Sequence, residues 1–479
     1  MLNTKGFTEL LELLSEKKVS SKEIAQSYIK RIEAIDKTIN AYITFDADRL
    51  LKEAELSDQR RSKGAALSPF DGIPVAINDN ICTSGIKTTC GSKILENFIP
   101  PYNAAVYDKL IEKGIIALGK TNLDEFGVGS STESSIFGPT KNPYDINRVP
   151  GGGSVGSAAA VSAFMAPASL GTDTGGQPAA FCGVIGIKPT CGRVSRYGII
   201  GYDSSLGQAG TFARNSKDSA ALLQIISGYD EKDSVSINRE VDINPKNISK
   251  NIKGLKIGLP EDCLNNTDGE TRRLIEQRID ELKKSGAEIK SINLKYTKYV
   301  SQISYLIGIA EASSNLAKFD GVGYGFRTAN VTDLSSLYIK TRSEGFGSEI
   351  KKRIILGTYA LSSKYYDAYY LKALKSRTII INDFKDAFTQ LDAIIAPTTL
   401  GPAFKPGEMP DDSLQMYMPD ALSISANLTG LPVLSVPAGL NKDGLPVGIQ
   451  IMGNYFDEQR IINIGAVLEE ICGEISPSI

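Results

Sequence analysis

The sequence predicts an α/β protein with a mixed, largely parallel central sheet that helices cover on both faces. Three observations predict this class. Short runs rich in β-branched residues alternate with amphipathic stretches of helical spacing along most of the chain. No repeat or low-complexity linker interrupts this alternation. With 479 residues, 42% of them hydrophobic and 23% charged, the chain is long enough to bury a large core.

The first elements are expected to be helices. Residues 7–34 show the spacing of two amphipathic helices, and Ser20 with Glu23 has the pattern of a capping box at the start of the second. A further helix of mixed charge is predicted over 47–63. We expect residues 1–66 to form a helical segment that packs on the main body.

Strands and helices then alternate to the end of the chain. Strands are predicted at 73–78, 115–119, 184–187, 255–259, 289–294, 392–397, 432–437 and 446–452, and helices at 104–113, 158–164, 217–227, 270–285, 296–318, 351–391 and 459–470. Residues 229–253, rich in Asp, Asn, Lys and Ser, are interpreted as a surface excursion and not as a domain boundary. The alternation therefore predicts one domain over residues 1–479.

Composition excludes several classes of function. The formal net charge of −2 argues against a generally basic surface for nucleic acid. No signal peptide or membrane-spanning apolar run is present, so we expect a cytoplasmic protein with no membrane contact. The six cysteines are scattered and are expected to be reduced. Because the chain contains no histidine, Ser-His-Asp systems, Cys-His systems and histidine zinc sites are excluded, and we predict no metal site.

The most informative stretch is residues 148–195. Two glycine-rich turns, at 151–157 and 171–176, flank a segment of small apolar residues. Glycines placed this densely let backbone N–H groups converge on a ligand, because no Cβ prevents close approach or a positive φ. One such turn would indicate only a loop, but two turns around one buried segment favour a site.

Many ordered motifs in this chain resemble the amidase signature family. They include Asp71-Gly-Ile-Pro-Val-Ala-Ile, Phe137-Gly-Pro-Thr-Lys-Asn-Pro, Lys188-Pro-Thr, Gly192-Arg-Val-Ser-Arg-Tyr-Gly and Gly444-Leu-Pro-Val-Gly-Ile-Gln. The resemblance covers nearly the whole chain and implies a single α/β/α domain. Ser343-Glu-Gly-Phe-Gly and Tyr365-Tyr-Asp-Ala-Tyr-Tyr look like the subgroup that provides the A subunits of tRNA-dependent amidotransferases.

The resemblance also implies a Ser-Ser-Lys mechanism, from which this sequence departs at all three positions. Asn78 stands where the family has the lysine base, and an amide does not accept a proton near pH 7. Gly153 stands at the serine that relays the proton. Gln177 directly follows Gly176, so the Ser-Ile-Arg segment that carries the nucleophile is missing from the degenerate stretch 148–195. Because a serine hydroxyl needs a base within reach, we predict that glutamine hydrolysis is lost.

Other family positions are kept. By resemblance, the backbone of Thr174, Gly175 and Gly176 would form an oxyanion hole, which requires N–H groups but no particular side chain. Arg353 and Asp420 match positions that hold the α-carboxylate and the α-amino group of glutamine, and such pairing suits a zwitterion. Ser154 remains in the first glycine turn as a candidate for substrate binding.

Several residues could in principle replace the missing base or nucleophile, but each is expected to have a structural role. Ser157 is expected to cap the helix that follows it, and Cys182 to be a buried structural thiol. Lys87 and Lys188 are expected to be solvated surface charges. Further departures from the family pattern occur at Val155, Gly207, where the family has the aspartate of Ser-Leu-Asp-Gln, Thr211 and Gly323.

Three hypotheses about function remain open. The resemblance implies an A subunit of the amidotransferase that forms Gln-tRNA(Gln) or Asn-tRNA(Asn). It would bind glutamine, assemble with B and C subunits and reach mischarged tRNA through the complex, while the B subunit uses ATP and magnesium and this chain carries no cofactor. The changes at Asn78, Gly153 and Gln177 instead favour a catalytically inactive binding or scaffold protein. A stand-alone small-amide hydrolase would need the same missing groups.

Overall fold

An 11-stranded sheet runs through the part of the protein that the computed structural model describes, residues 1–172, 174–265, 267–408 and 421–479. Its strand order is β1-β3-β2-β4-β6-β5-β10-β11-β9-β7-β8. The strands are β1 (Tyr42–Phe45), β2 (Pro74–Asn78), β3 (Ile116–Thr121), β4 (Ala168–Thr172), β5 (Ile185–Lys188), β6 (Ala209–Ala213), β7 (Lys256–Pro260), β8 (Glu288–Ile292), β9 (Ala393–Pro397), β10 (Val433–Leu440) and β11 (Pro446–Gly453).

The sheet is mixed, as predicted. Strand β2 runs parallel to β3 and β4, and β7 runs parallel to β8 and β9. The other neighbouring pairs are antiparallel, among them β10 with β11, which a short connection joins as a hairpin. Every residue of β2, β3, β4, β5, β6, β9 and β11 is buried, as expected for strands that helices cover on both sides.

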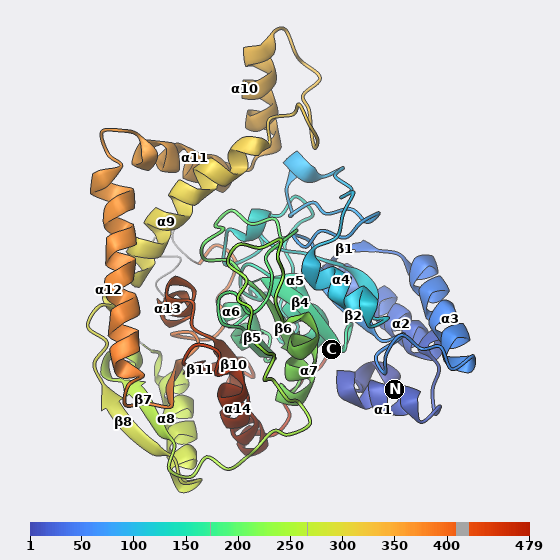
Figure 1. Cartoon of the computed structure of the whole chain (residues 1–479), viewed down its shortest axis with the longest axis vertical. Coiled ribbons are helices and arrows are strands. Elements are labelled where there is room, and N and C mark those ends of the chain that lie inside the picture. Colours follow the sequence, from blue (N-terminus) through green and yellow to red (C-terminus); the bar gives the residue numbers. More distant parts are fainter. Residues whose placement is uncertain (173, 266, 409–420) are drawn as a thin grey trace.

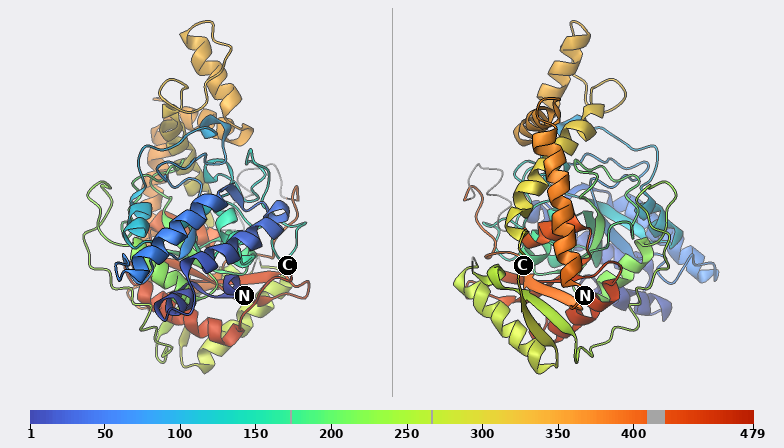
Figure 2. Two further views of the ribbon diagram at one scale, coloured as in Figure 1. Left: turned by 90° about the vertical axis from the view of Figure 1, so that its right-hand side faces the viewer. Right: turned by 60° about the vertical axis from the view of Figure 1, so that its left-hand side comes forward.

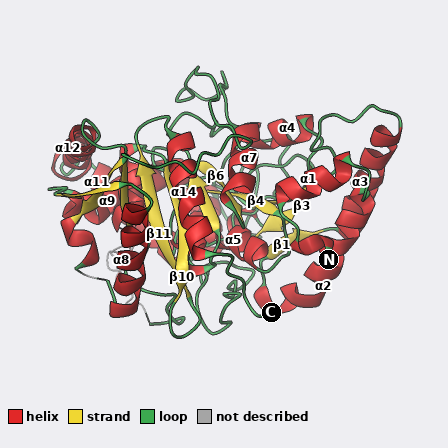
Figure 3. Ribbon diagram, turned by 90° about the horizontal axis from the view of Figure 1, so that it is seen from below, coloured by secondary structure: helices red, strands yellow, loops and turns green. Residues whose placement is uncertain are grey.

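Helices surround this sheet (Figure 3). They are α1 (Phe7–Ser15), α2 (Ser21–Ile39), α3 (Ala47–Ser62), α4 (Ala105–Glu112), α5 (Val155–Ser162), α6 (Gln177–Phe181), α7 (Ser216–Ile226), α8 (Gly269–Lys284), α9 (Val300–Asn315), α10 (Leu334–Gly345), α11 (Ser348–Leu361), α12 (Lys372–Ala387), α13 (Ala421–Thr429) and α14 (Glu458–Cys472). Short 3-10 turns occur at Leu2–Thr4, Lys93–Leu95, Glu125–Gly127, Glu261–Leu264, Thr297–Tyr299 and Leu316–Lys318, and a π-helical turn at Asp367–Leu371 precedes α12. No helix in these described ranges is long and apolar enough to cross a membrane.

The N-terminal helices lie where the sequence places them. Helix α2 begins with the predicted capping box, in which the Glu23 N–H donates to Ser20 Oγ at 3.1 Å and the Ser20 N–H donates to Glu23 Oε2 at 2.8 Å. Helix α1 is joined to α7 because the Phe7 N–H donates to Asp218 Oδ2 at 2.8 Å. Residues 229–253 contain no regular element and are largely exposed, as expected for a surface excursion.

Two features place the functional cavity. Helices α9, α11, α12 and α13 form a wall beside the sheet, and α10 projects beyond α11 away from the rest of the protein (Figures 1 and 2). On the sheet side, β2 and β4 end next to the start of α5. Ligand sites of α/β proteins commonly form beyond the carboxyl ends of neighbouring parallel strands.

Candidate active site

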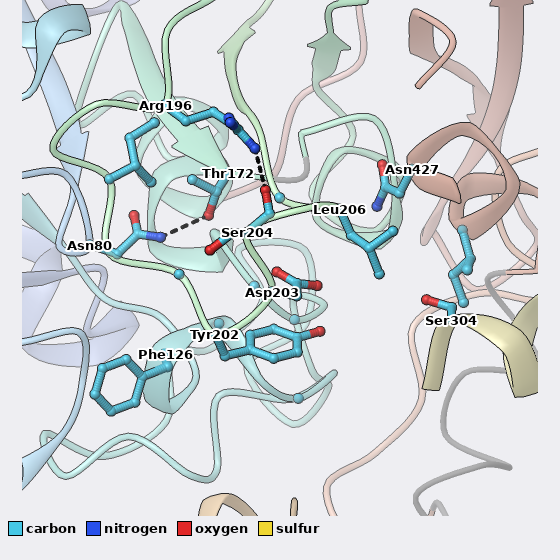
Figure 4. A pocket seen from close by; sticks show the side chains of 18 of the residues that line it. Asn80, Phe126, Thr172, Arg196, Tyr202, Asp203, Ser204, Leu206, Ser304 and Asn427 are labelled. Carbon is cyan, nitrogen blue, oxygen red and sulfur yellow. Dashed lines mark hydrogen bonds between the residues drawn. The ribbon is translucent and has the colours of Figure 1, made fainter. Parts of the chain in front are cut away.

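A cavity of about 310 Å³ lies between these carboxyl ends and the wall of helices (Figure 4). Its lining comes from segments far apart in the chain, including Asn80, Thr172, Gln177, Tyr202, Asp203 and Arg353. It thus brings together residues from both glycine-rich turns, from the loop before β6 and from α11.

The three positions predicted to depart from the family pattern lie at or next to this cavity. Asn78, the last residue of β2, is fully buried. Its Nδ2 donates to Ser154 Oγ at 2.8 Å and to Asn80 Oδ1 at 2.9 Å, while its Oδ1 has no hydrogen-bond partner among the described residues. Gly153 and Gln177 line the cavity beside this group. Asn78 does not line the cavity itself but contacts Ser154, the neighbour of Gly153.

Ser154 stands at the start of α5 and is enclosed by neutral groups. Its hydroxyl donates to the Thr172 carbonyl at 2.7 Å and accepts from Asn78 Nδ2 and from the Thr172 N–H. Its contact with Thr172 Oγ1 is 3.2 Å, and Asn80 Nδ2 donates to the same threonine hydroxyl at 3.1 Å. None of these partners, all from the described part of the chain, takes a proton near neutral pH.

The backbone at Gly153 fits glycine. Its φ is +66°, in the region that a Cβ disfavours, and the nearest atom to a Cβ built there is Thr172 O at 3.8 Å. Space is thus available for a serine side chain at this position, but its backbone conformation would be strained. The preceding Gly152 is tighter, since a Cβ there would lie 2.0 Å from Gly129 O.

The shortened second turn leads directly into α6. Gln177, the first residue of α6, is 2% exposed and lines the cavity, and its Nε2 has no hydrogen-bond partner in the described part of the chain. Thr174 lies on the sheet side, where its Oγ1 donates to Ile187 O at 2.5 Å. Gly175 lies against β10, because a Cβ there would be 2.3 Å from Val433 Cγ1. Thr174 and Gly175 therefore lie against β5 and β10, and Gln177 and Pro178, not residues 174–176, line the cavity.

Arg353 supplies a buried cation to the same cavity. It lies on α11, is 1% exposed, and its Nε donates to Glu349 Oε1 at 3.0 Å. Its guanidinium lies over the rings of Tyr202 and Tyr305, with ring-centroid distances of 5.4 Å and 5.5 Å. Asp420, its predicted partner in substrate binding, lies outside the described residues.

Sequence reasoning missed Tyr202, Asp203 and Tyr305. Tyr202 and Asp203 precede residues 205–208, which match the family's Ser-Leu-Asp-Gln, and the departure at Gly207 was the signal that this segment had changed. Tyr305 carried no signal, because one tyrosine in an apolar helical stretch predicts only packing.

Some of the roles predicted for the residues that could replace the missing base or nucleophile are wrong. Helix α5 starts at Val155, so Ser157 does not cap it; its Oγ donates to Leu170 O at 2.8 Å inside the helix. Lys188 is buried and not a surface charge, because its Nζ donates to Leu431 O at 2.7 Å and to Pro189 O at 3.0 Å. Lys87 is exposed as expected. Cys182 is a buried thiol as expected, and burial raises its pKa far above the ordinary value.

A second buried lysine, which the sequence did not single out, lies behind β2. Lys120 Nζ donates to Ile81 O and Thr88 Oγ1, both at 2.7 Å, and to Thr83 Oγ1 at 3.1 Å. Asp79 Oδ1 lies 3.5 Å from the same Nζ. Burial lowers the pKa of Lys120 and raises that of Asp79, and each charge opposes the effect on the other. This arrangement joins β3 to the loop that follows β2.

A buried cation, amide side chains and two glycine turns at the ends of β2 and β4 define a small-ligand site of an amidase-type fold. The amidase family model matches residues 23–462, and the chain belongs to this family.

Within the family, the chain is similar to the A subunits of glutamyl-tRNA(Gln) amidotransferases from several bacteria. It is 52% identical over 464 residues to that of Persephonella marina, covering 96% of each chain, and 50% identical over 476 residues to that of Heliobacterium modesticaldum, covering 98% of each. The crystal structure of the A subunit from Thermotoga maritima matches with a TM-score of 0.81 and 38% identity, covering 98% of this chain and 96% of that one. The peptide amidase of Stenotrophomonas maltophilia matches with a TM-score of 0.83 at 29% identity, covering 99% and 98%.

Proposed function

We propose that this chain acts as the A subunit of a tRNA-dependent amidotransferase and that it does not hydrolyse glutamine. Its similarity to the A subunits of known amidotransferases, over almost the full length of both chains, supports the first part. The B and C subunits would be its partners, mischarged tRNA would be reached through the complex, and the B subunit would use ATP and magnesium. Such a complex would work in the cytoplasm, where aminoacyl-tRNA is made.

The observation that carries the second part is the environment of Ser154. Its hydrogen-bond partners are Asn78 and Thr172, so the place of the family's lysine base holds an amide donor. A serine hydroxyl is a poor nucleophile until a neighbouring group takes its proton. Glycine replaces the relay serine at position 153, and the Ser-Ile-Arg segment that would carry the nucleophile is missing. The family's acyl-enzyme route would therefore have neither base nor nucleophile.

The test compares glutamine with ammonium chloride as the nitrogen source, using the chain assembled with the B and C subunits of its own organism. We expect tRNA amidation with ammonium and none with glutamine. Glutamine turnover at the rate of an ordinary amidotransferase would refute the loss of hydrolysis. Failure to assemble with B and C would refute the A-subunit role.

A restored variant makes this test sharper. It combines Asn78→Lys and Gly153→Ser with insertion of Ser-Ile-Arg between Gly176 and Gln177. The matched control carries the same changes with Ala-Ile-Arg inserted, so the loop length is equal and only the nucleophile differs. We expect the control to stay inactive and the restored variant to exceed it by several orders of magnitude, since catalytic groups that act as a unit contribute roughly 10⁴- to 10⁶-fold.

A second candidate function is a binding or scaffold protein without a role in amidation. The retained cavity with its buried Arg353 favours this alternative, because a ligand site persists where the reactive groups do not. Co-purification from the native organism distinguishes the two: an A subunit is recovered with B and C in equal amounts, and an independent binding protein is not.

A further inference from the structure

The motif Ser343-Glu-Gly-Phe-Gly forms the junction between α10 and α11. Helix α10 ends at Gly345, and Gly347 is the N-cap residue of α11 but has no side chain with which to cap it. The carboxylate of Glu125 takes this role, because the Gly347 N–H donates to Oε1 at 3.1 Å and to Oε2 at 3.0 Å. A residue 222 positions earlier in the chain therefore caps the helix that carries Arg353.

Both glycines of this junction are required for its close approach to the body of the protein. A Cβ built on Gly347 would lie 2.4 Å from Glu125 Oε2, and one built on Gly345 would lie 2.5 Å from Ile94 Cδ1. Real Cβ atoms do not come this close to other heavy atoms. A side chain at either position would therefore push the junction away from Glu125 and from the 3-10 turn Lys93–Leu95.

Glu125 connects two walls of the cavity. It belongs to the 3-10 turn Glu125–Gly127, and Phe126 of the same turn lines the cavity (Figure 4). Helix α11, which Glu125 caps, contributes Arg353 to the same lining. The Phe126 ring also packs on Phe346 of the junction, with 6.0 Å between the ring centroids. Movement of the junction away from this turn would therefore separate the two walls.

The surroundings of the Glu125 carboxyl favour its neutral form. The side chain is buried, and the groups that donate to it, the Ser92 hydroxyl and the Gly347 N–H, are both neutral. Burial raises the pKa of Glu125 to about 7, although these hydrogen bonds and the Lys351 ammonium act in the opposite direction. When the junction opens, water reaches the carboxyl and its pKa returns to the ordinary 4.5. The closed junction thus keeps a proton that the open junction releases.

The other charged groups on the surrounding elements have partners of their own. The neighbouring Asp124, whose pKa burial raises to about 6, accepts from the Ser134 hydroxyl at 2.7 Å and from the Thr132 N–H at 3.0 Å. Opening of the junction leaves these hydrogen bonds in place, because they lie within residues 124–134. The remaining groups are Lys93 over Phe326, Lys318 over Phe319, Arg342 over Phe346, Glu344 with Thr328, Glu349 with Arg353, and Lys351 with the Ser343 carbonyl.

We propose that Glu125 is a proton-dependent latch that holds the junction of α10 and α11 against the cavity wall. In its protonated form it keeps α11 docked. After losing the proton it is a buried carboxylate, and this cost is relieved when the junction moves away and water enters. The latch therefore loosens as the pH rises through neutrality, and the wall that carries Arg353 becomes free to move. The latch acts on the cavity wall whether or not the chain is the A subunit of an amidotransferase.

Amide hydrogen exchange of the full-length chain between pH 5 and pH 8, followed by mass spectrometry, tests the latch. After correction for the intrinsic exchange rate, protection of peptides that cover residues 346–352 measures how often the junction opens. A carboxyl that titrates near 7 in the closed state and near 4.5 in the open state makes opening about 50- to 100-fold more frequent at pH 8 than at pH 5. We expect this change at the junction. We also expect the junction to open more often than α14 at every pH, because the motion is local.

Three variants identify the group that titrates. Glu125→Gln keeps an oxygen that accepts from the Gly347 N–H but does not titrate, so corrected protection at the junction should become independent of pH. Glu133→Gln, at an exposed carboxylate of the following loop, is the matched control and should keep the native profile. Gly347→Ala brings a Cβ against the Glu125 carboxyl and should lower protection at pH 5 by about tenfold or more.

The comparison of the native chain with Glu125→Gln and Glu133→Gln decides the matter. Equal corrected protection of the native junction at pH 5 and pH 8 overturns the latch, as does a native pH profile in Glu125→Gln. Equal protection of the junction and α14 also overturns it, because the opening would then be global unfolding. If Gly347→Ala does not fold, the other three proteins still give the answer. A profile that depends on pH in the native chain and in Glu133→Gln, and is flat in Glu125→Gln, supports the latch.

Discussion

The buried pair of Lys120 and Asp79 offers the sharpest test of how the site is held together. In Lys120→Met the aliphatic stem is kept, but the ammonium group that contacts Ile81 O, Thr83 Oγ1 and Thr88 Oγ1 is lost. The Asp79 carboxylate then remains fully buried, with hydrogen bonds from the Thr89 hydroxyl at 2.5 Å and the Thr89 N–H at 2.8 Å. Breaking a buried ion pair from one side costs about 3–5 kcal/mol, because an uncompensated charge is left behind.

A double-mutant cycle isolates this charge effect. Asp79→Asn removes the charge and keeps an oxygen that accepts from the Thr89 N–H, so Lys120→Met should cost at least about 1.5 kcal/mol less in that background. The measurement is the free energy of unfolding from urea denaturation at pH 7.5, followed by circular dichroism. Lys113→Met, at an exposed lysine, is the control and should change it by less than about 0.5 kcal/mol. A cost below about 1 kcal/mol for Lys120→Met, or no coupling with Asp79→Asn, would refute the structural role of the pair.

Two other predictions concern ligand binding in the cavity and the pH dependence of the protein's stability. Arg353→Lys should weaken glutamine binding by about tenfold or more, because an ammonium does not offer the planar fork of a guanidinium, and calorimetry against the native protein checks this. Burial raises the pKa of Glu125 to about 7, against hydrogen bonds from Ser92 and the Gly347 N–H, so the folded state holds this proton more tightly than the unfolded state. The stability that protonated Glu125 contributes is therefore fully present below the ordinary pKa of 4.5 and is lost as the pH rises through about 7. Glu125→Gln should reduce this loss between pH 5 and pH 8 by roughly 2–3 kcal/mol, as measured by urea unfolding; an unchanged pH profile would contradict it.

The sequence predicted those elements whose periodicity is long or whose caps are strong. Helix α2 was predicted from its capping box and its apolar face, and both are present. Strands β4 and β6 were missed because Ala168–Thr172 and Ala209–Ala213 are rich in Ala, Gly and Thr, so that only burial in the sheet defines them. Helix α10 was missed because its apolar residues Leu334, Tyr338 and Ile339 face outward and do not form a core stripe.

The candidate site was predictable where motifs carry it and unpredictable where distant segments meet. Asn78, Gly153 and Gln177 were singled out from the order of their neighbours in the chain; Gly153 and Gln177 line the cavity, and Asn78 contacts Ser154 next to Gly153. Lys188 was predicted wrongly because it donates to the Leu431 carbonyl, 243 residues away in the chain. The local sequence does not reveal such a contact. Asp203 was missed for the same reason, since its place in the cavity lining depends on segments that are distant in the sequence.

A shortened turn between β4 and α6, as the resemblance implies, is compatible with the cavity described above. Losing three residues inside a strand would shift its register and turn its side chains to the other face. Here β4 ends at Thr172 and α6 begins at Gln177, so the shorter connection ends before β5. Strand β5 then pairs regularly with both neighbours, with Gly186 opposite Phe212 of β6 and Ser435 of β10. The remaining walls of the cavity come from the loop before β6 and from α9, α11 and α13, so they do not depend on the length of this turn.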